Sequence, residues 1–179
     1  ADMMVIEGPK AGGHLGFSKE QVENYIQYDG EANKPGEANF DEEILAILEV
    51  VKEYASLYNT EIPVVVAGGI SSAEEMDRIM ALGVQGVQVA TPFITTEECD
   101  ADVNYKMAFV NAQKEDIQIV KSPVGMPGRA ILNPFMKKVM AGEKFPPKKC
   151  LACLQKCNPS EIPYCITEAL VHAAKGEVD

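Results

Sequence analysis

Two short segments constrain the fold of this chain more than any other feature. Residues 62–67 read Ile-Pro-Val-Val-Val-Ala, and residues 84–89 read Val-Gln-Gly-Val-Gln-Val. Both are rich in β-branched residues, and a helical pattern over 73–82 lies between them. Mostly apolar strands of this kind are typical of a parallel sheet covered on both faces. The sequence therefore predicts strand–helix–strand units of an α/β fold.

Small residues follow each of the two predicted strands. Gly68 and Gly69 come directly after the first strand, and Ala90 and Thr91 come after the second. The carboxyl ends of adjacent parallel strands share one edge of a sheet, which is where such sheets bind ligands. Glycine lets a backbone approach a ligand closely, and a following helix offers unpaired amide hydrogens. Two such turns favour a phosphate cradle, whereas one alone would favour a simple tight turn.

The same pattern extends along the chain in both directions. Residues 3–7 predict a buried strand, and a helix is expected to begin near Asn39, with Glu42 completing a capping box. Residues 29–39 predict a surface excursion, and residues 126–129 are expected to break the chain. Further helices are expected over 18–28, 95–112, 133–141 and 161–174, and a short strand over 117–121. Ser72 and Glu75 predict a cap for the helix over 73–82, with Met76, Ile79 and Met80 on its inner face.

Three strand–helix units predict part of a larger protein. A three-stranded parallel sheet has exposed edges, and a closed eight-stranded barrel needs about 250 residues. We expect residues 1–120 to form these units and residues 121–179 to form a separate tail. The charge supports this division, because 7 basic and 22 acidic residues give 1–120 a balance of −15, whereas 9 and 5 give the tail +4. Open strand edges also predict self-association of the isolated chain as a homo-oligomer.

Composition excludes several classes of protein. The net charge of −11 over 179 residues argues against nucleic-acid binding, because phosphates would be repelled. No run approaches the roughly 18 apolar residues that span a membrane. The first residues have no basic start and no cleavage signature, so the expected location is cytoplasmic.

Four segments resemble one known family when they are taken together. They are Glu-Gly-Pro-Lys-Ala-Gly-Gly-His at 7–14, Pro-Val-Val-Val-Ala-Gly-Gly-Ile at 63–70, Gly-Val-Gln-Val-Ala-Thr-Pro-Phe at 86–93, and the stretch 123–135. Their order and spacing resemble those of the nitronate monooxygenases, formerly called 2-nitropropane dioxygenases. That family also includes flavin-dependent enoyl-acyl carrier protein reductases and NAD(P)H:quinone reductases.

The resemblance implies a TIM barrel that binds FMN without a covalent link. This chain would supply the sixth, seventh and eighth strands and the tail, and its partner would be the N-terminal remainder of the barrel. Backbone amides of Gly68, Gly69, Ala90 and Thr91 would hold the FMN phosphate. The other cofactor-binding residues implied are Gly12, Gly13, Ala67, Gln88 and Val89.

His14 is the candidate catalytic base. It follows a predicted strand in a glycine-rich loop, which would let a small-molecule substrate and a flavin come close. The ordinary pKa of a histidine side chain, about 6.5, suits removal of an α-proton near neutral pH. A histidine that only bonds to loop backbone is the plain alternative. For His172, late in an apolar-faced helix, we prefer a structural role.

Several functions remain open at this point. The resemblance implies oxidation of alkyl nitronates with O2, and equally an NAD(P)H-dependent flavin reductase acting on enoyl thioesters or quinones. A non-catalytic barrel fragment is an alternative from another class. A phosphosugar enzyme would share the paired phosphate turns, but the Ala-Gly-Gly-His loop counts against it.

The tail contains four closely spaced cysteines: Cys150, Cys153, Cys157 and Cys165. Thiols at this spacing could take zinc or an iron–sulfur cluster, or they could pack as small apolar groups. The packing role is the one we expect, so no residue is assigned as a metal ligand. Cys99 stands alone on a predicted helix and is expected in the core.

Overall fold

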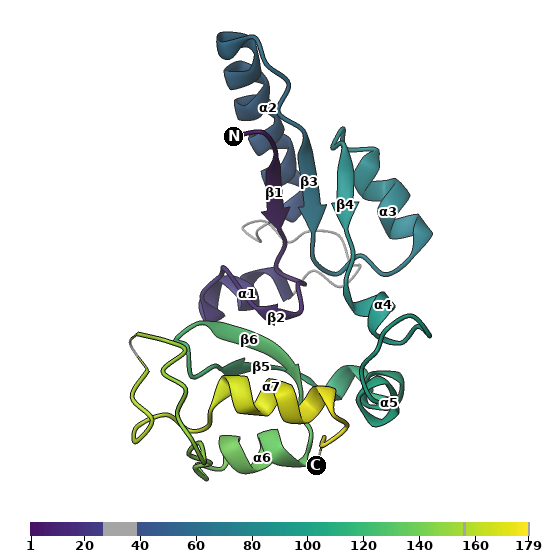
Figure 1. Cartoon of the computed structure of the whole chain (residues 1–179). Coiled ribbons are helices and arrows are strands. Elements are labelled where there is room, and N and C mark those ends of the chain that lie inside the picture. The colour runs from purple at the N-terminus through teal and green to yellow at the C-terminus, as the bar shows by residue number, and fades with distance from the viewer. Residues whose placement is uncertain (27–38, 156, 179) are drawn as a thin grey trace. The chain divides into compact units, whose positions relative to one another are not determined.

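The structure is a computed structural model that describes residues 1–26, 39–155 and 157–178. These residues form two compact units, each containing its own three-stranded sheet (Figure 1). The first unit comprises Ala1–Gly12 and Gly16–Thr91, and the second comprises Gly13–Leu15 and Pro92–Asp179. Most of the expected surface excursion over 29–39 lies outside the described residues. The proposed domain division at residue 120 stays a prediction.

The first unit contains the parallel sheet that the sequence predicts. Its strands are β1 (Met4–Glu7), β3 (Val64–Ala67) and β4 (Gly86–Gln88), in the order β1-β3-β4. Both pairings are parallel, and Val66 lies between Ile6 on one side and Val87 on the other. The register aligns the last residues of the three strands at one edge, where the candidate ligand-binding turns begin.

Helices α2 (Phe40–Tyr58) and α3 (Ala73–Met80) pack against one face of this sheet. The unit also contains α1 (Lys19–Ile26), and α4 (Thr91–Ile94) begins on its last residue. Ile44 of α2 and Ile79 of α3 pack with Val64 and Val66 in one buried cluster. Side chains alternate across a strand, so Val5 belongs to the opposite face, where it is 47% exposed. Within this unit, the described residues therefore bury mainly one face of the sheet.

The helix caps confirm some of the expected detail and correct the rest. Ser72 and Glu75 form the predicted capping box of α3. Asn39 caps α2 as expected, but its side chain accepts from the Asp41 amide and donates to the Glu42 carboxylate, so no capping box forms. The predicted inner face of α3 is wrong in part. Ile79 is buried, whereas Met76 and Met80 are about 40% exposed, because β4 is an edge strand and α3 has neighbours on one side only.

The second unit is built on an antiparallel sheet in the order β2-β6-β5. The strands are β2 (Gly13–His14), β5 (Ile117–Lys121) and β6 (Pro127–Ile131). Helices α5 (Val103–Asn111), α6 (Pro134–Met140) and α7 (Ile166–Ala174) and a 3-10 turn (Lys114–Asp116) complete it. Its core joins Val120, Met136 and Tyr164, and Phe135 stacks edge-on against Tyr164.

Three expectations for this second unit are wrong. Residues 126–129 are expected to break the chain, but they lead into β6, where Pro127 is the first residue, a position that tolerates proline. The helix expected over 95–112 is α5, which begins only at Val103 and is capped by Asp102, whose side chain accepts from the Asn104 amide. The closing helix expected from residue 161 begins at Ile166, because a turn at 158–162 precedes it.

Candidate functional site

The turn after β3 is held in place by the loop after β1. The Gly8 amide donates to the Ala67 carbonyl at 2.8 Å, and the Ala11 amide donates to the Gly8 carbonyl at 3.1 Å. Gly68 and Gly69 both have positive φ angles, 99° and 77°. Ala67 and Ile70 on either side are buried, and Gly69 is exposed. The turn is therefore anchored at both ends and open to a ligand in its middle.

Both glycines of this turn are required by the packing of that loop. A Cβ on Gly68 would lie 3.0 Å from the Ala11 nitrogen and from the Gly8 oxygen, and a Cβ on Gly69 would lie 2.5 Å from the Lys10 Cβ. Positive φ also strains any residue with a side chain. The close approach that the sequence assigned to a phosphate is already made by protein atoms of the first loop.

The amides at the start of α3 are mostly occupied. A single Glu75 carboxylate oxygen accepts from the Ser71 amide at 2.7 Å and from the Ser72 amide at 3.2 Å, and the Ser72 hydroxyl accepts from the Glu75 amide. The bond from the Ser71 amide, more than any other contact, lowers the pKa of Glu75 below its ordinary value. The expectation that this helix end offers unpaired amides is therefore wrong for these three residues.

The turn after β4 is more open. Gln88, Ala90 and Thr91 are exposed, and Val89 is half-buried. A Cβ on Gly12 would lie 3.6 Å from the Thr91 hydroxyl oxygen, so the first loop and this turn are neighbours. The ends of β1, β3 and β4 thus come together in the first unit. They bring Gly12, Ala67, Gly68, Gly69, Gln88, Val89, Ala90 and Thr91 to one edge of the sheet.

His14 belongs to the second unit, where it has a defined partner. Its Nε2 atom is hydrogen-bonded to the Ser122 hydroxyl at 2.7 Å, and the Ser122 side chain is only 5% exposed. Ser122 begins the turn between β5 and β6, where its carbonyl accepts from Gly125, and its hydroxyl accepts from the Val124 amide at 3.4 Å. No partner of His14 Nδ1 is present among the described residues. One ring nitrogen is therefore fixed and the other is available.

Gly128, on the middle strand of this sheet, lies beside the imidazole of His14. His14 on β2 pairs with Gly128 on β6, and Gly128 pairs with Val120 on β5. A Cβ on Gly128 would lie 3.8 Å from His14 Cδ2, which places the imidazole close to this position. His14 and Ser122 lie on the two outer strands or their ends, so the histidine reaches its partner past a position without a side chain.

Sequence reasoning missed two residues near these candidates. Ser122 lies 108 positions from His14, and only the pairing of β2 with β6 reveals the contact. Ser122 directly precedes the stretch 123–135 that resembles the family. Lys10 was also missed, although it lies in the glycine-rich loop. Gly13, predicted to bind the cofactor, falls in the second unit with His14, whereas the other predicted cofactor-binding residues fall in the first.

The tail cysteines are close together but hold no ready-made metal site. In the described residues, no three His, Cys, Asp or Glu side chains are placed so that they could bind a metal ion. Burial, and then the three neighbouring thiols of Cys150, Cys153 and Cys165, raise the pKa of Cys157. The Ala152 amide donates to Cys150 Sγ at 3.4 Å, and Cys153 Sγ lies 3.3 Å from the Thr167 hydroxyl.

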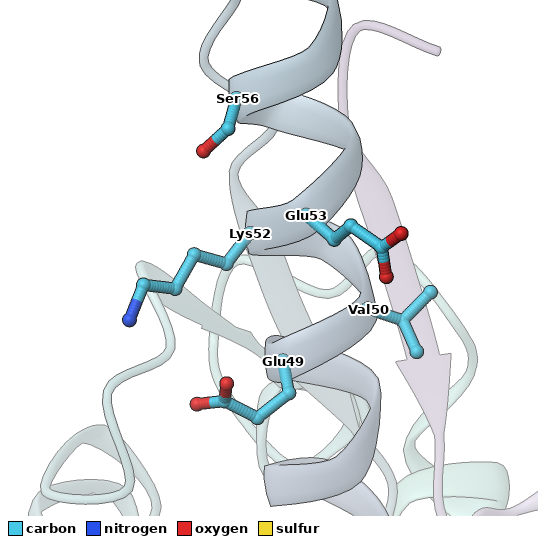
Figure 2. A pocket seen from close by; sticks show the side chains of 5 residues that line it. All are labelled: Glu49, Val50, Lys52, Glu53 and Ser56. Atoms are coloured by element: carbon cyan, nitrogen blue, oxygen red, sulfur yellow. The ribbon is translucent and has the colours of Figure 1, made fainter.

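Two hollows on the described surface of the first unit lie apart from the candidate site. Figure 2 shows one whose lining side chains all come from the single helix α2: Glu49, Val50, Lys52, Glu53 and Ser56. The second lies between α2 and the amino ends of β3 and β4, opposite the strand ends that carry the candidate site. Across the described ranges, no helix has the length and apolar character needed to cross a membrane.

Comparisons with known proteins identify the family of this chain. A family model described as nitronate monooxygenase matches residues 1–177. A probable nitronate monooxygenase of Staphylococcus saprophyticus is 30% identical over 138 residues, covering 77% of this chain and 34% of that protein. A similarly named protein of Staphylococcus haemolyticus is 28% identical over 147 residues, covering 82% and 36%.

The comparison with solved structures matches a similar share of this chain. The structure of FabK from Thermotoga maritima matches with a TM-score of 0.51 and 27% identity, covering 79% of this chain and 36% of that one. The chain therefore spans about a third of the length of the relatives that it matches. The predicted fold class, part of a TIM barrel with an additional tail, is confirmed.

Proposed function

Because this chain belongs to the nitronate monooxygenase family, we propose that it supplies FMN-binding turns and a catalytic base to an FMN-dependent oxidoreductase. The reaction proposed is the oxidation of alkyl nitronates with O2. One observation carries the proposal: the loop after β1 and the turns after β3 and β4 meet at a single edge of the parallel sheet. In a TIM barrel, a phosphate site formed by loops after the last strands is a frequent arrangement.

The residues at this edge fit a phosphorylated flavin. Gly69, Ala90 and Thr91 are exposed, so their backbone groups and the Thr91 hydroxyl are accessible to a phosphate. Gln88 is the last residue of β4, and its side chain would lie near the flavin ring. When bound, FMN would supply the electron transfer that amino-acid side chains cannot perform. The chain would supply binding, orientation and proton transfer.

For a neutral nitroalkane, His14 is proposed to take the α-proton and so to generate the nitronate that is then oxidised. A neutral imidazole with its proton on Nε2 would donate to the Ser122 hydroxyl, which leaves the Nδ1 lone pair free to accept. After proton transfer, the imidazolium keeps the same hydrogen bond, and Ser122 stabilises the charge. A base held in one tautomer and one orientation needs no reorganisation before it reacts.

The experiment that tests the proposal is a flavin assay followed by an activity assay. Purified full-length protein should show flavin absorbance, and the released cofactor should have the mass of FMN. The protein should consume O2 with a nitronate or with its parent nitroalkane, and His14→Ala should reduce the rate with the nitroalkane while FMN stays bound. A protein without flavin under reconstitution with excess FMN would contradict the proposal and favour a non-catalytic fragment.

A second candidate function is an NAD(P)H-dependent flavin reductase. The family that the sequence motifs resemble includes such reductases, and identities of 30% and 28% to the named nitronate monooxygenases do not separate the two functions. Anaerobic mixing with NADH or NADPH discriminates between the two functions. Rapid bleaching of the flavin by a nicotinamide indicates the reductase, whereas bleaching by a nitronate alone indicates the monooxygenase.

A further inference from the structure

Lys10 lies against the turn after β3. A Cβ placed on Gly69 would be 2.5 Å from Lys10 Cβ, 3.5 Å from its Cγ and 3.3 Å from its Cδ. The aliphatic stem of Lys10 therefore runs along the exposed Gly69 backbone. A lysine stem that packs on backbone in this way keeps its ammonium group at the solvent edge. The charge is thus held beside the very turn that we propose to bind phosphate.

A negative charge also lies close to this turn, on the helix that follows it. The Glu75 carboxylate accepts from the Ser71 and Ser72 amides, directly after the turn. The charge of Lys10 is among the causes that lower the pKa of Glu75, so the ammonium and the carboxylate are near each other. A phosphate monoester at Gly68 and Gly69 would be repelled by this carboxylate, and a cation is needed to offset that repulsion.

We propose that Lys10 is a phosphate-binding side chain that lets the turn after β3 prefer FMN over riboflavin. The inference rests on the proposed function and adds a charged side chain to a site otherwise made of backbone groups. Lysine serves phosphate recognition as a mobile point charge, in contrast to the bidentate geometry of arginine. Its flexible stem suits a position where it can also neutralise Glu75.

The test compares two flavins that differ only by the phosphate. Full-length protein freed of flavin is titrated with FMN and with riboflavin, using the quenching of flavin fluorescence. Lys10→Met keeps an unbranched stem and removes the charge, and it should weaken FMN binding about fivefold while leaving riboflavin binding unchanged. Lys10→Arg should keep the preference. Added salt should weaken FMN binding in the wild type more than in Lys10→Met.

Lys19→Met is the matched control. Lys19 is exposed in the same unit and forms an ion pair with Glu23 at 3.7 Å, so the variant changes the net charge equally at another place. Should Lys10→Met fail to fold, Glu75→Gln tests the same electrostatic effect on a bound phosphate by removing the negative charge instead of the positive one. Glutamine still serves a capping box, and loss of the negative charge should tighten FMN binding but not riboflavin binding.

Each result has a distinct meaning. Equal weakening of FMN and riboflavin in Lys10→Met, or no change in either, would overturn the role of Lys10. A wild-type protein that binds neither flavin would overturn the proposed function itself. Binding of FMN by the wild type, with a selective loss in Lys10→Met, would support both.

Discussion

In the first unit the candidate binding groups are mainly backbone groups at strand ends, whereas in the second unit they are side chains brought together from distant segments. Gly68, Gly69, Ala90 and Thr91 are each within a few positions of the strand that places them. His14 and Ser122 are 108 positions apart and meet because β2 pairs with β6. The first arrangement tolerates changes of side chain wherever φ permits them, and the second depends on particular side chains.

The largest effect is expected at His14. His14→Ala should lower turnover about 10²- to 10⁴-fold, the usual contribution of a general base, because no other group is proposed to take the proton. FMN affinity should change little, since phosphate binding is assigned to the first unit. The measurements are steady-state kinetics and flavin titration. Unchanged turnover on every neutral nitroalkane and nicotinamide tested would remove His14 from the mechanism.

The next effect tests the backbone character of the first unit. Gly68→Ala adds a Cβ at a φ of 99° and at 3.0 Å from two backbone atoms, so it should lower the free energy of unfolding by about 2–3 kcal/mol. Gly83→Ala is the matched control, because its φ is 100° and its Cβ would meet only Leu48 at 3.9 Å. It should cost about 1 kcal/mol. Urea unfolding measures both, and equal losses would show that the loop after β1 does not constrain the turn.

Gly69→Val is a poor test of phosphate binding, because the loop after β1 also packs closely against Gly69. The valine side chain would collide with Lys10 before any ligand arrived. Lower flavin affinity in that variant would therefore report a displaced loop as readily as an obstructed phosphate. Lys10→Met avoids this ambiguity, because it removes a charge without adding a side chain to the turn.

A smaller effect is expected from the partner of the base. Ser122→Ala removes the hydrogen bond to His14 Nε2 and should lower turnover about threefold to tenfold, in line with a net hydrogen-bond contribution near 1 kcal/mol. Ser160→Ala is a suitable control, because the Ser160 hydroxyl bonds only locally to Asn158. If Ser122→Ala changes Kd for FMN and leaves turnover intact, the separation of roles between the two units is wrong.

The smallest effect concerns the tail. A raised pKa leaves less thiolate at a given pH, so Cys157 should be alkylated a few times more slowly than Cys150 and Cys153 near pH 8. The difference should vanish as pH rises through the pKa of Cys157. Timed reaction with iodoacetamide and peptide mass spectrometry measure each rate. Uniform rates at pH 8 would mean that neither burial nor the three neighbouring thiols raise the pKa of Cys157.

Prediction from sequence succeeded where structure is local. The parallel strands and the capping box of Ser72 and Glu75 follow from short patterns, because each depends on residues within about one helical turn or one strand. The occupied amides at the start of α3 follow from that capping box, yet the same segment was expected to leave its amides free. One carboxylate cannot complete a capping box and leave those amides available to a phosphate.

Prediction failed where the partner is remote. Proline and glycine at 127 and 128 suggest a break when neighbouring residues are considered alone. The pairing of β6 with both β5 and β2 outweighs that local preference. The contact between His14 and Ser122 could not be predicted for the same reason, since no periodicity links two segments so far apart. The sequence likewise could not show that Lys10 and Glu75 lie close to the same turn.

The pairing of β2 with β6 has a consequence for the order in which the second unit folds. The hairpin of β5 and β6 closes a short turn, whereas β2 must close a loop of more than a hundred residues, and loop-closure entropy disfavours the longer one. The hairpin is therefore expected to form first and β2 to dock last. Exchange of the Leu15 amide, which donates to the Pro127 carbonyl, would report this docking directly. An opening that releases β2 would separate the His14 imidazole from Ser122, while the core around Val120 stays intact. The candidate base would then reach its working position late in folding and leave it early in unfolding.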